Sequence, residues 1–177
     1  AFFDSVQDYC RELAENIERE GEGRGRLIWY ATLALLRCVA SSPAAAVKAL
    51  TTRLEGSLET HDLLTDERLH DGEADDLDSN DLEPPAQLEE ANRLQSLIEE
   101  AERLSGKAGD PKLAALIRHI EALVRDGYHP VVFCRYIATA HYVADQLRKA
   151  IPSATIESIT GEYTPEERRE RVEAMDE

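Results

Sequence analysis

The pattern that most constrains the fold lies in residues 129–176, where two β-rich runs alternate with two helical patterns. Val131–Cys134 is a short apolar run, and residues 138–150 follow it with helical spacing. Residues 155–159 form a second β-branched run, after which Thr164-Pro165-Glu166-Glu167 opens a second helix. Two strands joined by a helix must be parallel, with a right-handed crossover. We therefore predict an α/β region with a partial parallel sheet.

The turns that follow the two predicted strands share one edge of this sheet. Arg135-Tyr136 follows the first strand, and Thr160-Gly161-Glu162 follows the second. Ligands of open parallel sheets bind beyond the carboxyl ends of the strands. This edge is where we expect a binding site.

Upstream of this region, the sequence predicts helices and an acidic segment. Apolar residues recur at helical spacing in residues 4–20 and 27–40, with Gly21 to Gly25 as a break, and Ser42-Pro43 starts a third helix. We expect Trp29 to lie in the core. The predicted organisation is a helical subdomain (1–56), an acidic linker (57–85), a connecting helix (86–109) and a partial α/β lobe (110–177).

The net charge of −16 argues against strong electrostatic binding of nucleic-acid phosphates by this chain alone, because free-standing nucleic-acid binders are usually basic. The charge is uneven, since residues 55–83 hold twelve acidic residues and a single arginine. Three isolated cysteines in apolar runs favour a reducing, cytoplasmic location, and no apolar run reaches the length of a membrane span. The absence of an initiator methionine and the unfinished helix at the end predict a fragment of a larger protein.

The sequence of motifs in residues 110–177 resembles the second RecA-like lobe of superfamily 2 helicases and translocases. VVFCRYIATAHYVADQL looks like helicase motif IV and its helix, and ITGEYTPEERRERVEAM looks like the segment that follows. Asp110-Pro111-Lys112-Leu113 resembles the helix before motif IV in SWI/SNF-like translocases. Leu36-Arg37-Cys38 with Ser42-Pro43 faintly resembles the element between their two lobes.

This resemblance implies a truncated C-terminal helicase lobe, whose missing first RecA-like lobe would be a partner. The whole protein would use ATP and Mg²⁺ to move along nucleic acid, with DNA favoured over RNA. The arginines of motif VI would stabilise the γ-phosphate. Neither the phosphate loop G-x-x-x-x-G-K-[ST] nor motifs V and VI occur in the chain, so we expect it to hold no ATP and to be inactive alone.

Four residues are candidates for contacting a nucleic-acid backbone: Arg135, Thr139, Gly161 and Arg168. Arg135 would reach a phosphate, or is a solvated loop arginine. Thr139 marks a helix start whose N–H groups attract anions, or an ordinary helix start. Gly161 would allow close approach of a bound strand, or serves a turn with positive φ. Arg168 matches a phosphate-contacting arginine of DEAD-box proteins, or is a surface residue.

Other residue patterns have simpler structural explanations. Cys134 has no dyad partner nearby in sequence and is expected to pack in the core. His61 and His70 lack ligand spacing, and we predict no metal site. A second function stays open, a non-enzymatic α/β protein-interaction module whose acidic segment binds a basic partner.

Overall fold

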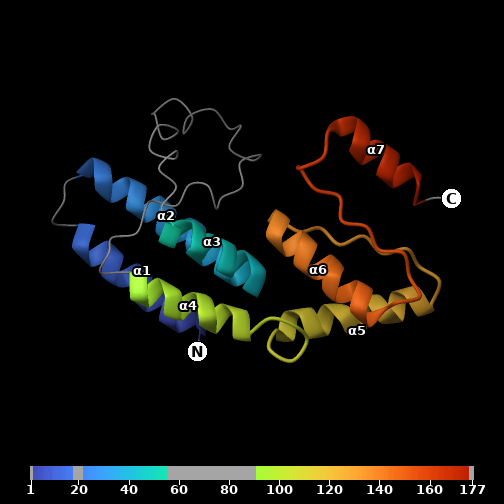
Figure 1. Cartoon of the computed structure of the whole chain (residues 1–177), viewed down its shortest axis with the longest axis horizontal. Coiled ribbons are helices and arrows are strands. Elements are labelled where there is room, and N and C mark those ends of the chain that lie inside the picture. Colours follow the sequence, from blue (N-terminus) through green and yellow to red (C-terminus); the bar gives the residue numbers. More distant parts are fainter. Residues whose placement is uncertain (1, 18–21, 56–90, 176–177) are drawn as a thin grey trace. The chain divides into compact units, whose positions relative to one another are not determined.

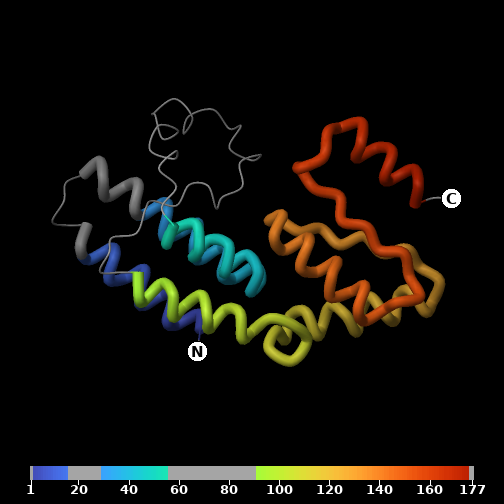
Figure 2. Tube along the Cα trace, viewed as in Figure 1, coloured from blue at the N-terminus to red at the C-terminus, as the bar shows by residue number. Residues whose placement is uncertain are grey.

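The computed structural model describes residues 2–17, 22–55 and 91–175, with residues 16, 17 and 22–28 described by their backbone alone. The chain divides into two compact units, Ala1–Arg103 and Leu104–Glu177. Figure 2 follows the chain through both units. Each unit has its own helices and its own buried side chains.

The first unit consists of four helices, α1 (Phe2–Ile17), α2 (Glu22–Ser41), α3 (Pro43–Glu55) and α4 (Ala91–Arg103). α2 packs against α1 and α3, and α4 packs against the same two helices, so the four enclose one core (Figure 1). Buried apolar residues recur every three or four positions, as amphipathic helices require. They include Val6, Tyr9, Leu13, Leu35, Cys38, Ala46, Leu50, Leu94, Leu97 and Ala101.

The start of α3 confirms the cap predicted from sequence, because the Ala45 N–H donates to the Ser42 hydroxyl at 3.1 Å. Two other expectations for this unit were wrong. Trp29 is 56% exposed and stacks edge-on against exposed Tyr30, so the apolar character of α2 does not bury every side. Gly23 and Gly25 lie within α2, whose hydrogen bonds and packing offset the modest helix penalty of glycine.

Arg53 is the charged side chain at the centre of the first unit, where it is 3% exposed. Its Nε donates to the Tyr9 hydroxyl, and its guanidinium lies 5.4 Å from the centroid of that ring. Arg93 of α4 lies at the same distance from the ring and pairs with Glu12 of α1. Tyr9 therefore links α1 to both α3 and α4 through its ring and hydroxyl.

The second unit contains α5 (Pro111–Arg125), α6 (Ile137–Ala150) and α7 (Pro165–Glu173). Its core joins Leu113, Ile117 and Ile120 of α5 to Leu147 and Ile151 at the end of α6. Val132, Ala154 and Ile156 pack against this cluster from the segments outside the helices. The apolar face of α5 is therefore the face that forms the core.

Both ends of α5 are fixed by local hydrogen bonds. The Asp110 carboxylate caps the first turn by accepting from the Leu113 N–H at 3.0 Å. At the other end, Tyr128 N–H donates to Leu123 O and Gly127 N–H to Val124 O, with Gly127 at φ +85°. This is a Schellman ending, which satisfies carbonyls that the helix leaves free.

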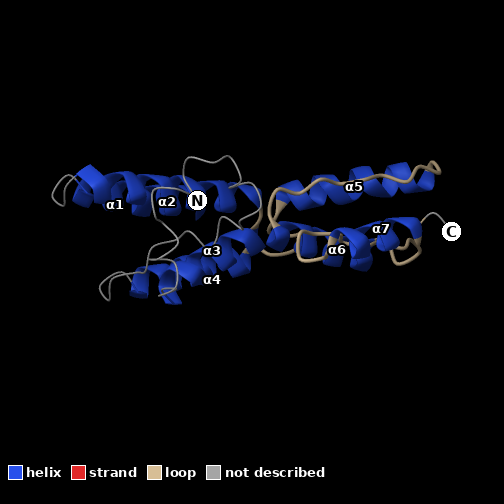
Figure 3. Cartoon of the chain, turned by 90° about the horizontal axis from the view of Figure 1, so that it is seen from above, coloured by secondary structure: helices blue, strands red, loops and turns tan. Residues whose placement is uncertain are grey.

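The prediction of a parallel α/β sheet was wrong. No strand occurs in residues 2–17, 22–55 or 91–175, and Figure 3 shows only helices and loops there. Residues 131–134 and 155–159 are extended, but their backbones form no backbone–backbone hydrogen bond with each other or with any described residue. A helix satisfies its backbone locally, whereas a strand requires a neighbour, and two strands alone make a marginal sheet.

The first helical turn of α7 has the capping box that the sequence predicted. The Thr164 hydroxyl accepts from the Glu167 N–H at 3.3 Å, and the Glu167 carboxylate accepts from the Thr164 N–H at 2.8 Å. No residue of α7 is buried. Local capping therefore fixes where this helix begins, and apolar burial contributes little to it.

The acidic linker predicted at residues 57–85 lies outside the described residues, as do His61 and His70. The helix expected from residue 86 is seen as α4, which packs within the first unit. Across the described helices, none combines the length and apolar character that crossing a bilayer would need.

Candidate functional site

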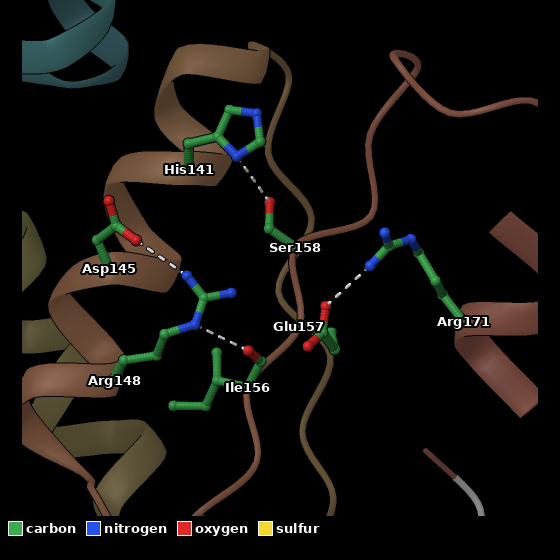
Figure 4. Close-up of polar contacts among 7 residues, drawn as sticks. All are labelled: His141, Asp145, Arg148, Ile156, Glu157, Ser158 and Arg171. Carbon is green, nitrogen blue, oxygen red and sulfur yellow. Dashed lines mark hydrogen bonds and ion pairs between the residues drawn. The ribbon is translucent and has the colours of Figure 1, made fainter. Parts of the chain in front are cut away.

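The second extended segment runs antiparallel to α6, which fixes what lies beside the start of that helix. Near the end of α6, Arg148 Nε donates to the Ile156 carbonyl at 3.0 Å, while Arg148 Nη1 pairs with Asp145 at 2.9 Å. Near its start, His141 lies beside Ser158 (Figure 4). Later residues of the segment thus meet earlier residues of α6, which places the turn at 160–163 beside the first half of the helix.

A chain of polar contacts joins α6 to this turn. His141 Nε2 lies 2.6 Å from a Glu162 carboxylate oxygen, and the Ser158 hydroxyl lies 3.4 Å from His141 Nδ1. A carboxylate only accepts, so Nε2 carries a proton, and Nδ1 accepts from Ser158 whenever the imidazole is neutral. The same Glu162 oxygen accepts from the Thr160 hydroxyl at 2.9 Å.

The order serine, histidine, glutamate is that of a nucleophilic relay, but the geometry here fits a positioning role. The carboxylate and the hydroxyl contact the imidazole nitrogens, and the serine contact is at the long end of hydrogen-bond range. The His141 and Glu162 side chains are 45% and 55% exposed, so water screens their interaction. We assign the chain of contacts the role of holding the turn against α6.

Gly161 lies in the turn held by these contacts. Its φ is not in the positive range, which rules out the turn requirement considered from sequence. A Cβ built on it would meet no atom within 4 Å. Neither the backbone conformation nor internal packing of the described residues therefore demands glycine at this exposed position.

Arg135 and Thr139 lie at the start of α6 but differ in accessibility. Arg135 is exposed and forms no ion pair with a described residue. Thr139 is only 7% exposed, so its hydroxyl is not presented to a large ligand. The helix begins after Tyr136, which provides no side-chain cap to the first turn. Of these two candidates, only Arg135 offers a side chain to solvent.

Arg168 lies in the first turn of α7, is exposed, and likewise forms no ion pair with a described residue. Its neighbour Arg171 differs, since it pairs with Glu157 at 3.5 Å and lies 4.2 Å from the Tyr163 ring centroid. Arg171 therefore attaches α7 to the second extended segment, as Figure 4 shows, and Arg168 is left available.

The contact between Glu162 and His141 brings the neighbouring Gly161 close to α6, and His141 lies two residues after Thr139 in that helix. Sequence reasoning missed His141 and Ser158, which are separated from Glu162 and from each other along the chain. The sequence signals only the turn that they contact. In its Thr160-x-Glu162 spacing, the Glu162 N–H donates to the Thr160 hydroxyl at 3.3 Å.

The structure also bears on the reactivity of Cys134 and on a possible metal site. Cys134 is half-buried, and burial raises the pKa of its thiol. A raised pKa lowers the fraction of nucleophilic thiolate at neutral pH. Within the residues that the structure describes, no three histidine, cysteine or acidic side chains gather as metal ligands would.

Comparison with protein-family models, curated proteins and solved structures found no match to this chain.

Proposed function

We propose that the chain is part of an ATP-dependent nucleic-acid helicase or translocase and that its second unit contacts the sugar-phosphate backbone. The observation that carries the proposal is a pair of exposed arginines, Arg135 and Arg168, neither neutralised by a carboxylate among the described residues. Arg135 lies two residues before α6, and Arg168 lies in the first turn of α7. The N-terminal end of α6, whose first turn holds no acidic residue, adds positive potential for an anion.

Gly161 supports the same proposal. Neither a positive φ nor internal packing explains why residue 161 is a glycine. The absence of a side chain fits a requirement for close approach of the nucleic-acid backbone. Thr139 would contribute to this contact only through the backbone N–H groups at the start of α6, because its side chain is buried. A motor that moves along any sequence must read phosphates, since phosphates carry no base identity.

The charge distribution suits this assignment better than the net charge of the chain suggests. Residues 104–177 contain twelve acidic and ten basic residues, whereas residues 1–103 contain twenty-four and ten. Most of the excess negative charge therefore belongs to the first unit. ATP and Mg²⁺ would be held by residues outside this chain, and we keep a cytoplasmic location as part of the proposal.

A salt titration of oligonucleotide binding tests the proposal. Arg135→Ala and Arg168→Ala should each flatten the slope of log affinity against log salt by about 0.7 to 0.9, because each arginine displaces about one counterion. Arg118→Ala is the matched control, since Arg118 is exposed on α5 and should leave the slope unchanged. Equal slopes for all three variants, or no binding at low salt, would overturn the assignment.

The acidic first unit favours a second candidate, a non-enzymatic module that binds a basic partner. The two candidates separate cleanly in one measurement. A basic partner held by the first unit would bind equally well to wild type and to the double variant of Arg135 and Arg168, whereas nucleic acid would not.

A further inference from the structure

His141 joins α6 to the turn at residues 160–163. Its Nε2 lies 2.6 Å from a Glu162 carboxylate oxygen, and the same oxygen accepts from the Thr160 hydroxyl at 2.9 Å. The Glu162 N–H in turn donates to the Thr160 hydroxyl at 3.3 Å. The two residues on either side of Gly161 are therefore linked to each other, and the link continues to the helix through His141.

The second ring nitrogen of His141 restricts the orientation of the imidazole. The Ser158 hydroxyl lies 3.4 Å from Nδ1, and Ser158 belongs to the extended segment that leads into the turn (Figure 4). A partner at each nitrogen fixes the proton position and the orientation of a histidine ring better than one partner does. Nε2 is therefore kept directed at Glu162, the residue that follows Gly161.

Gly161 lies between these linked residues and is itself open to solvent. Thr160 before it is 7% exposed, and Glu162 after it contacts His141. Gly161 is exposed, and a Cβ built on it would meet no atom within 4 Å. Because a glycine has no side chain to hold it in place, the contacts of its two neighbours determine how its backbone is presented.

We propose that His141 is a positioning residue for nucleic acid and that it acts through Gly161. By holding Glu162, His141 keeps the backbone of Gly161 in a conformation that a sugar-phosphate backbone can approach closely. A turn that samples other conformations binds with an affinity reduced by the fraction of time it spends in the competent one. This inference rests on the proposed function, because it explains how one of the contacts proposed there is kept in place.

A double-mutant cycle of oligo-dT binding to the full chain at low salt tests whether His141 acts through Gly161. His141→Ala should weaken binding several-fold, because the turn loses this contact. Gly161→Ala should also weaken binding, because a methyl group hinders close approach, although it meets no atom in the free chain. The double variant should bind no more weakly than the weaker single variant, since two residues that act through one contact are not additive.

Two further variants and one NMR measurement separate positioning from a general loss of stability. His141→Gln keeps an N–H donor and should recover most of the wild-type affinity. His119→Ala is the matched control, since His119 is an exposed histidine of α5 and should leave the affinity unchanged. The amide order parameter of Gly161 should fall from about 0.85 to about 0.6 or lower in His141→Ala, and should be kept in the other two variants.

The outcomes distinguish this inference from the proposed function on which it rests. Four results would overturn the positioning role alone and leave Arg135 and Arg168 as phosphate contacts. They are wild-type affinity of His141→Ala, full additivity with Gly161→Ala, an unchanged order parameter of Gly161 in His141→Ala, and equally weak binding by His141→Gln. No binding of oligo-dT by the wild-type chain at low salt would overturn both the proposed function and this inference.

Discussion

At the scale of single residues, Gly109 and Gly161 differ in the space available for a side chain. A Cβ on Gly109 would lie 2.5 Å from the Leu104 carbonyl oxygen, and backbone atoms cannot yield as a flexible side chain does. Gly109→Ala should therefore reduce the free energy of unfolding by about 1–3 kcal/mol, as overpacking does. Gly161→Ala, which meets no atom, should leave it unchanged or raise it by up to about 1 kcal/mol. Urea unfolding of both variants measures the difference, and equal effects would contradict it.

Tyr142 ties the loop before α5 to α6. Its hydroxyl accepts from the Gly106 N–H at 2.9 Å and donates to the Asp110 carboxylate at 3.3 Å. Tyr142→Phe should destabilise the unit by about 1 kcal/mol, the net value of such hydrogen bonds.

The pH dependence of this variant is a further check. Burial is the largest cause that raises the pKa of Tyr142 above its ordinary value of 10.0. The contribution of a group with a raised pKa is complete below its unfolded value and is lost as pH rises through the folded value. Wild type should lose its advantage over Tyr142→Phe above about pH 10, and a constant difference up to pH 12 would contradict this.

At the scale of elements, the capping box makes α7 sensitive to acid. The hydrogen bond from the Thr164 N–H lowers the pKa of Glu167 below its ordinary value of 4.5. A lowered pKa contributes stability above the unfolded value, and this stability is lost as pH falls through the folded value. The amide signals of Thr164 and Glu167 should therefore report fraying of α7 below about pH 4. Glu167→Gln retains a cap without a titrating group, so its fraying should not follow this acid transition.

The helices were predictable from sequence because their causes are local. Ser42, Asp110 and Thr164 cap helices within three residues of themselves, and Gly127 ends α5 in the same short range. The absence of strands in the described residues was not predictable, because pairing depends on residues far away, and the described residues supply no backbone partner for 131–134. The alternation of Val132 inward and Phe133 outward was present in the sequence, but alternation alone does not make a ladder.

The candidate site was only partly predictable for the same reason. The turn at Thr160–Glu162 was recognisable from its residues, but His141, twenty-one positions from Glu162, was not. Exposure also had to come from the structure. Thr139, a candidate for contacting a ligand, is buried, whereas Trp29, expected in the core, faces solvent.

At the scale of the whole molecule, the chain should not hydrolyse ATP. It contains no G-x-x-x-x-G-K-[ST] sequence, the loop whose backbone and lysine cradle the phosphates. Phosphate release by the purified chain should equal that of a mock preparation, with and without nucleic acid. Turnover that nucleic acid stimulates and that co-purifies with the chain through successive columns would contradict this expectation.

The contacts that attach α7 also determine which part of the second unit unfolds first. No residue of α7 is buried, and the helix is fastened through Arg171 to Glu157 and Tyr163. Local opening is easiest where few apolar contacts must break, so this helix should detach while the core of α5 and α6 stays folded. Within the second unit, brief trypsin digestion should cut first after Arg168 or Arg169, and later in α5. Adding salt should hasten the first cuts, because it weakens the ion pair that serves as the fastening.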